Sequence, residues 1–137
     1  MMRLATSQVL ASTTARQRRA AAVIHLEGAR YGLLAFRLAD THAHALLLAT
    51  RAEAGRFARY TSTRLRAGLA LDVPFDRARF KAIEDQGHLQ STFRYILRQE
   101  ERHEIALDPR HEASSAPDLL GMRLIAPGFT ARVLEAL

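Results

Sequence analysis

The stretch that decides the fold is Leu33-Leu-Ala-Phe-Arg-Leu-Ala-Asp-Thr-His-Ala-His-Ala-Leu-Leu-Leu48. Two largely apolar runs, residues 33–38 and 42–49, flank the short connection Ala39-Asp40-Thr41, and Gly32 comes directly before the first run. Short apolar runs bounded by turn-forming residues are typical of β-strands. So tight a connection brings the second strand back beside the first, and we therefore predict a β-hairpin.

Helical patterns lie on both sides of this hairpin. Residues 14–30 repeat apolar side chains at helical spacing, and Thr13 or Thr14 can cap them. Thr50 can cap a second helix that runs to about Leu69, and Asp85 can cap a third that runs to about His103. The order of elements predicts an α+β fold in which packed helices cover a small antiparallel sheet.

Weaker patterns occupy the segments between these elements. Residues 71–75 and 77–83 are candidates for further strand, and Pro74 favours an edge or a break in the pairing. Residues 3–11 are a candidate for an N-terminal strand, but the polar residues at 6–8 argue against it. We therefore expect the N-terminal strand to be missing or degraded.

Length and composition bound the fold and its setting. A chain of 137 residues, of which 48% are hydrophobic, suits one domain over 1–137, with a core at about 14–124 and a helical tail at 125–137. Prolines and glycines after residue 104 predict loops, with short helices near 117–124 and 130–137. The absence of cysteine excludes disulfides and thiolate zinc sites. Because no long apolar run or secretory signal pattern occurs, we expect a cytoplasmic protein with no membrane partner.

The chain is strongly basic, with a formal charge of +6 at pH 7 and a pI of about 10.9. Such a charge predicts an acidic partner, and nucleic acid ranks ahead of a membrane. Lys81 is the only lysine among 20 basic residues, so the arginine bias of a GC-rich genome explains the charge equally well. The candidate DNA contacts are the basic side chains Arg56, Arg59, Arg64 and Lys81.

His42 and His44 lie two residues apart in the second predicted strand. Strand alternation places both imidazoles on one face, where they can bind one divalent cation, since imidazole is a common metal ligand. The same pattern also fits two structural histidines at a strand end near solvent. His25, in contrast, is expected on a helix surface without a metal.

Tyr95 and Gln99 lie four residues apart in the third predicted helix and therefore share one of its faces. The apolar stripe of that helix is centred elsewhere, so Tyr95 is not an obvious core residue. A phenol beside an amide oxygen suits a metal-assisted nucleophile, in which Gln99 would supply a neutral ligand. An ordinary surface tyrosine is the competing interpretation.

The hairpin with His42 and His44 resembles the strand-turn-strand that carries the HUH motif (His, hydrophobic residue, His) of the REP-associated tyrosine transposases. Arg79-Phe80-Lys81, Glu84-Asp85, Arg94-Tyr95-Ile96 and the segment from Ser114 to Arg123 resemble that family in order and spacing. The likeness covers about residues 14–124. It departs from the family in the short, polar residues 1–13 and in the Gln99-Glu100-Glu101 step, where an Asn-Pro step is usual.

This resemblance to single-tyrosine HUH transposases implies a ferredoxin-like palm and single-stranded or hairpin DNA as substrate. It further implies Mg²⁺ or Mn²⁺ on His42, His44 and Gln99, with Tyr95 as the nucleophile that forms a 5′-phosphotyrosine. The expected function is a transposase-like endonuclease and strand transferase, acting as a monomer or homodimer. The alternative is a catalytically inactive or domesticated DNA-binding protein of the same fold, and an unrelated His-x-His metalloenzyme is a third reading.

Overall fold

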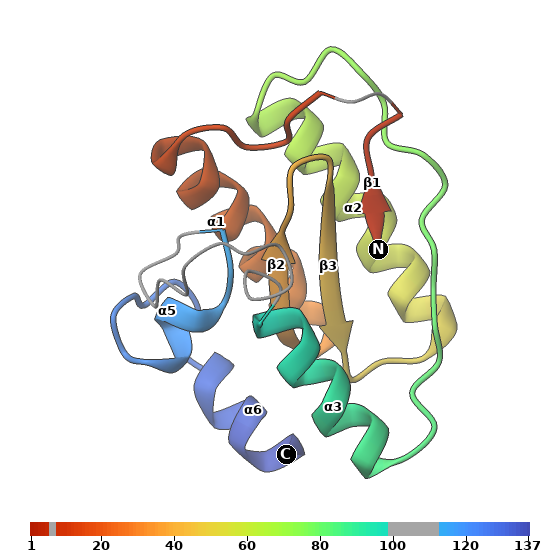
Figure 1. The fold of residues 1–137 in the computed structure, drawn as a ribbon, viewed down its shortest axis with the longest axis vertical. Helices are drawn as coiled ribbons and strands as arrows, with labels where there is room; N and C mark the ends of the chain where they lie inside the picture. Colours follow the sequence, from red (N-terminus) through yellow and green to blue (C-terminus); the bar gives the residue numbers. More distant parts are fainter. Residues whose placement is uncertain (6–7, 99–112) are drawn as a thin grey trace.

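The computed structural model describes residues 1–5, 8–98 and 113–137. The predicted hairpin is confirmed: β2 (Leu33–Leu38) and β3 (His42–Leu47) pair antiparallel, with Arg37 opposite His44. A hydrogen bond from the amide of Ala39 to the carbonyl of His42, 2.8 Å long, closes the turn. In the described residues β3 is the central strand of a three-stranded sheet with the order β1-β3-β2 (Figure 1).

The N-terminal strand is present but very short. β1 (Met2–Arg3) pairs antiparallel with β3, placing Met2 opposite Ala43 and Arg3 opposite His42. It is therefore neither missing nor spread over residues 3–11. A two-residue strand still gives β3 a paired neighbour on each side at Ala43, the residue between the two histidines.

The strands predicted over residues 71–75 and 77–83 do not form. This segment instead runs beside β1 and bonds to it through scattered backbone contacts: Ala5 to Pro74, Asp76 to Arg3 and Arg79 to Met1, at 2.7–3.0 Å. Within this segment, the strand-like pairing with the described N-terminal residues is limited to an isolated antiparallel bridge between Leu4 and Phe75. Pro74 lacks the N–H that a regular ladder needs, which agrees with the predicted break.

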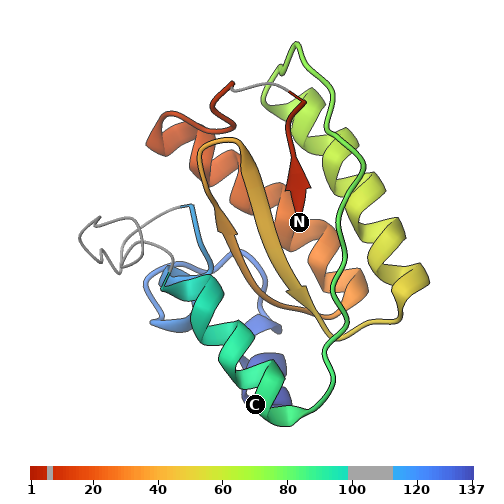
Figure 2. The ribbon, with the colours of Figure 1, turned by 45° about the vertical axis from the view of Figure 1, so that its right-hand side comes forward.

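Helices cover both faces of the sheet (Figures 1 and 2). The ring of Phe36 packs against His25 of α1 (Thr14–Tyr31), whereas its neighbour Arg37 bonds to carbonyls of α3 (Gln86–Leu97). Because successive strand residues point to opposite faces, α1 and α3 lie on opposite sides of the sheet. α2 (Arg51–Gly68) packs beside α1, where its Arg64 is paired with Glu27.

The predicted helix caps are those that the structure shows. The side chains of Thr13, Thr50 and Asp85 accept the amide hydrogen bonds that begin α1, α2 and α3, and Thr50 forms a capping box with Glu53. α1 ends at Gly32, whose φ of +70° lies in the left-handed region that favours glycine. α3 ends at Leu97, before the expected end near His103. No described helix is long and apolar enough to cross a membrane.

The C-terminal part covers the outer edge of β2. Phe36 and Ser115 exchange hydrogen bonds, and α5 (Ala116–Leu119) and α6 (Phe129–Ala136) follow. Phe129 is 1% exposed and its ring lies 4.8 Å from that of His25, so the core extends past residue 124 into the predicted tail.

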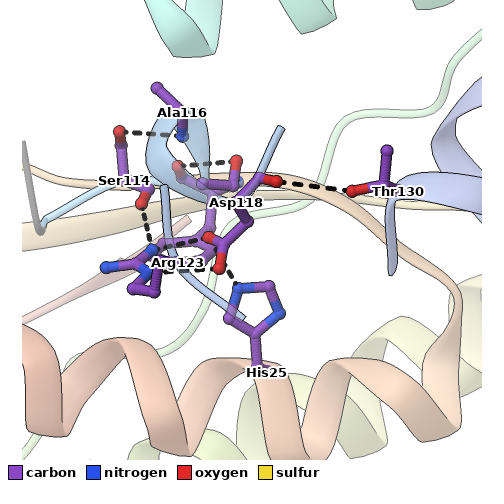
Figure 3. Close-up of polar contacts among 8 residues, drawn as sticks. His25, Ser114, Ala116, Asp118, Arg123 and Thr130 are labelled. Atoms are coloured by element: carbon purple, nitrogen blue, oxygen red, sulfur yellow. Dashed lines mark hydrogen bonds and ion pairs between the residues drawn. The ribbon is translucent and has the colours of Figure 1, made fainter. Parts of the chain in front are cut away.

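A buried polar cluster joins this C-terminal part to α1 (Figure 3). Nε2 of His25 lies 3.0 Å from Oδ2 of Asp118, and Arg123 donates to both oxygens of the same carboxylate at 3.1 and 2.6 Å. The prediction that His25 lies on a helix surface is wrong, since only 1% of this residue is exposed. The contact of Nε2 with Asp118 and the packing against Phe36 and Phe129 hold this histidine in the core, although its buried Nδ1 has no hydrogen-bond partner among the described residues.

Candidate functional site

His42 and His44 lie side by side on the face of β3 that α3 covers. Their ring centroids are 4.8 Å apart, although residues two apart in a strand are separated by roughly 6.6 Å at the backbone, so the rings lean together. Two nitrogens that share one ion, each about 2.1 Å from it, lie within roughly 4.2 Å of each other. The ring separation therefore fits a common cation.

Both imidazoles suit the role of metal ligand. Burial, followed by repulsion from His42, from the N-terminal amino group and from Arg3, lowers the pKa of His44 to about 4. His44 is consequently neutral at pH 7 and keeps a lone pair for a cation. Nδ1 of His42 lies 3.4 Å from the hydroxyl of Thr41, a contact that helps to orient the ring.

Tyr95 of α3 faces this pair of histidines. Its ring centroid is 6.4 Å from that of His44, with the two rings perpendicular, and 43% of Tyr95 is exposed to solvent. A residue of the third helix and two residues of the hairpin, about fifty positions apart in the chain, are thus brought together. Gln99, the predicted third ligand, lies outside the described residues.

Within the described residues, no group of three His, Asp or Glu side chains could hold a metal ion. A site here would therefore complete its two histidines with a protein ligand from the rest of the chain or with a ligand of another type. The amide oxygen of Gln99 is of that type, and bound water or a phosphate oxygen of a substrate would complete the coordination. Imidazole nitrogen suits transition metals such as Zn²⁺ and Fe²⁺, whereas neutral oxygen suits Mg²⁺ and Mn²⁺, so this mixed donor set does not by itself select one metal.

Two arginines next to the histidines were not predicted. Arg3 lies opposite His42 on β1, and Arg37 lies opposite His44 on β2, so both start from the face that carries the imidazoles. Arg37 is 3% exposed and donates from Nε to the carbonyl of Ile96 at 2.9 Å and from Nη2 to that of Leu97 at 3.0 Å. The signal in the sequence was a charged residue inside the apolar run 33–38.

The predicted DNA contacts do not line this site. Arg56, Arg59 and Arg64 are exposed on α2, which lies across the sheet from Tyr95, and Nε of Arg64 is engaged by Glu27 at 2.5 Å. Lys81 borders a cavity of about 720 Å³ between β3, the start of α2 and the start of α3. His88, at the start of α3, accepts a hydrogen bond from the amide of Glu84 through its Nδ1.

No protein-family model, curated protein or solved structure matches this chain.

Proposed function

We propose that this protein cleaves and rejoins single-stranded DNA, using Tyr95 as the nucleophile and a divalent cation held by His42, His44 and Gln99. The observation that carries the proposal is the convergence of two close imidazoles, one of them held neutral, with a solvent-accessible tyrosine 6.4 Å away. The arrangement supports the resemblance to REP-associated tyrosine transposases and their ferredoxin-like palm.

The residues would divide the chemistry as follows. The phenolic oxygen of Tyr95 attacks a backbone phosphorus, the bond from phosphorus to the 3′ oxygen breaks, and a 5′-phosphotyrosine and a free 3′ hydroxyl result. A bound Mg²⁺ or Mn²⁺ would polarise the scissile phosphate and offset its developing charge. Attack by a second 3′ hydroxyl on the phosphotyrosine restores the phenol, which makes the same site a strand transferase.

The covalent intermediate provides the test. Labelled hairpin and single-stranded oligonucleotides incubated with Mn²⁺ should yield a protein–DNA adduct that survives denaturing electrophoresis. Tyr95→Phe should abolish the adduct and leave binding intact, because it removes only the hydroxyl. His42→Ala and His44→Ala should also abolish it, since each removes a metal ligand.

Tyr60→Phe is the matched control. Tyr60 is 44% exposed, against 43% for Tyr95, but lies on α2 across the sheet from the histidines. This substitution should leave the adduct yield unchanged. An adduct that persists in Tyr95→Phe would overturn the assignment of the nucleophile, whereas DNA binding without any adduct would favour the inactive or domesticated DNA-binding protein.

A further inference from the structure

A small basic hollow lies beside the site, at the outer edge of β1. It has a volume of about 390 Å³ and is lined by Met1, Arg3 and the segment Asp76, Arg77, Ala78 and Arg79. Two backbone hydrogen bonds fix that segment to β1, from Asp76 to Arg3 at 2.7 Å and from Arg79 to Met1 at 3.0 Å. Figure 2 shows this segment running alongside β1, so the hollow lies at a strand edge.

The three guanidinium groups of this hollow have no side-chain partner within the part of the chain that the structure describes. Arg3, Arg77 and Arg79 are exposed, and none of them makes a side-chain hydrogen bond or ion pair with another described residue. Asp76 supplies the one carboxylate of the lining and is likewise unpaired within the described part of the chain. In contrast, Arg16 and Arg132 donate to backbone carbonyls, and Arg64 pairs with a buried glutamate.

The hollow is continuous with the proposed catalytic site through Arg3. Arg3 is the direct neighbour of His42 across the β1–β3 ladder, and such opposed residues have Cβ atoms roughly 5 Å apart on one face. A phosphate at the histidines therefore lies next to the first guanidinium of the hollow. The planar fork of arginine binds two oxygens of a phosphate or a carboxylate at once. Three guanidinium groups in one hollow therefore suit a ligand with several anionic groups, such as a chain of phosphates, better than a single carboxylate.

We propose that Arg3, Arg77 and Arg79 bind the phosphates that flank the scissile position and guide a single DNA strand to Tyr95. This inference rests on the proposed function for the identity of the substrate. It replaces the α2 arginines predicted from the sequence, which lie on the other side of the sheet. The strand would leave the site along the outer edge of β1.

Salt dependence of binding tests the proposal. Arg77→Gln with Arg79→Gln removes two charges from the hollow, and Arg56→Gln with Arg59→Gln removes two from α2 as the matched control. Affinity for a fluorescein-labelled thymidine oligonucleotide is measured by anisotropy over a range of salt concentrations. Because each lost phosphate contact reduces the slope of log K against log salt by about 0.7 for a single strand, the hollow variant should lose roughly 1.4 from the slope. The α2 variant should keep the wild-type slope.

The outcomes separate this inference from the proposed reaction. An unchanged slope in the hollow variant, or an equal loss in the α2 variant, overturns the role of the hollow even if the wild type forms the tyrosine adduct. A selective loss of slope without any wild-type adduct supports the hollow and refutes the chemistry. If the wild type binds no single strand at low salt, both proposals fail. All four residues are exposed, so circular dichroism should show that both variants remain folded.

Discussion

Replacing Arg37 with methionine should loosen the helix that carries Tyr95. Arg37 is buried on β2 and donates two hydrogen bonds to the last turn of α3, whose carbonyls have no partner inside the helix. Its positive charge also lies at the helix end where the macrodipole is negative. The residue opposite Arg37 is His44, so one strand position ties α3 to the proposed metal ligands.

The magnitude follows from the two bonds. Each hydrogen bond to a charged group contributes about 1.5–3 kcal/mol, part of which water returns once the carbonyls open to solvent. Methionine fills a similar volume, so the cavity contribution is small. We expect Arg37→Met to lower the free energy of unfolding by about 3 kcal/mol. A displacement of Tyr95 by about 1 Å should slow adduct formation roughly 100-fold.

Urea unfolding followed by circular dichroism measures the change in the free energy of unfolding. The nuclear Overhauser effect between the ring protons of His44 and Tyr95 reports the position of α3, and it can be measured without metal or DNA. Arg37→Lys keeps the positive charge but lacks the planar guanidinium group that donates both hydrogen bonds. Compared with Arg37→Met, it should therefore retain more of the free energy of unfolding and more of the nuclear Overhauser effect. Arg132→Met removes the bond of Arg132 to the carbonyl of Leu33, 3.0 Å long, and should leave the ring contact unchanged. If Arg37→Met unfolds within about 0.5 kcal/mol of the wild type and keeps the ring contact, the positioning argument fails.

Two further predictions concern the fold. Asp118→Asn should cost about 3 kcal/mol at neutral pH in urea unfolding, because it weakens the buried pairing with His25 and Arg123. Burial raises the pKa of Asp118, but hydrogen bonds from His25 and Arg123 outweigh it and hold the pKa below its ordinary value. The advantage of wild type over Asp118→Asn should therefore be complete above about pH 3.9 and fade as the pH falls through the lower folded pKa, and a constant difference down to pH 2 would contradict this. Gly32→Ala should lower the melting temperature by several degrees, since its φ is +70° and a Cβ would lie 2.5 Å from the carbonyl oxygen of Leu48; an unchanged melting temperature would refute that strain.

The sequence predicts the elements of this fold whose signals are local. The hairpin and the caps at Thr13, Thr50 and Asp85 depend on residues within a few positions of each other, and all are present. The segment 71–83 could not be placed in the same way. Whether such a segment forms a strand depends on a partner distant in the chain, and β1 offers it only two residues.

The buried charges show the same limit at the level of single residues. His25 and Arg37 are polar residues in apolar surroundings, and spacing alone favours a solvent position for His25. Their burial depends on acceptors far away in the sequence. The acceptor for His25 is the carboxylate of Asp118, and the acceptors for Arg37 are carbonyls at the end of α3. A buried polar group without a partner would cost several kcal/mol, so these side chains can be buried only where the fold brings an acceptor within reach. Spacing along the sequence does not reveal such distant acceptors.

The candidate site unites two electrostatic requirements that would otherwise conflict. A metal ligand must be neutral, whereas a polyanionic substrate needs positive charge nearby. Burial and the charges around His44, among them that of Arg3, lower its pKa to about 4 and so keep its lone pair free at pH 7. Arg3 is itself exposed and lies directly opposite His42 in the β1–β3 ladder. An arginine side chain carries a positive charge at pH 7. The same guanidinium therefore contributes to keeping His44 unprotonated and, in the proposed reaction, would attract the phosphate of the substrate.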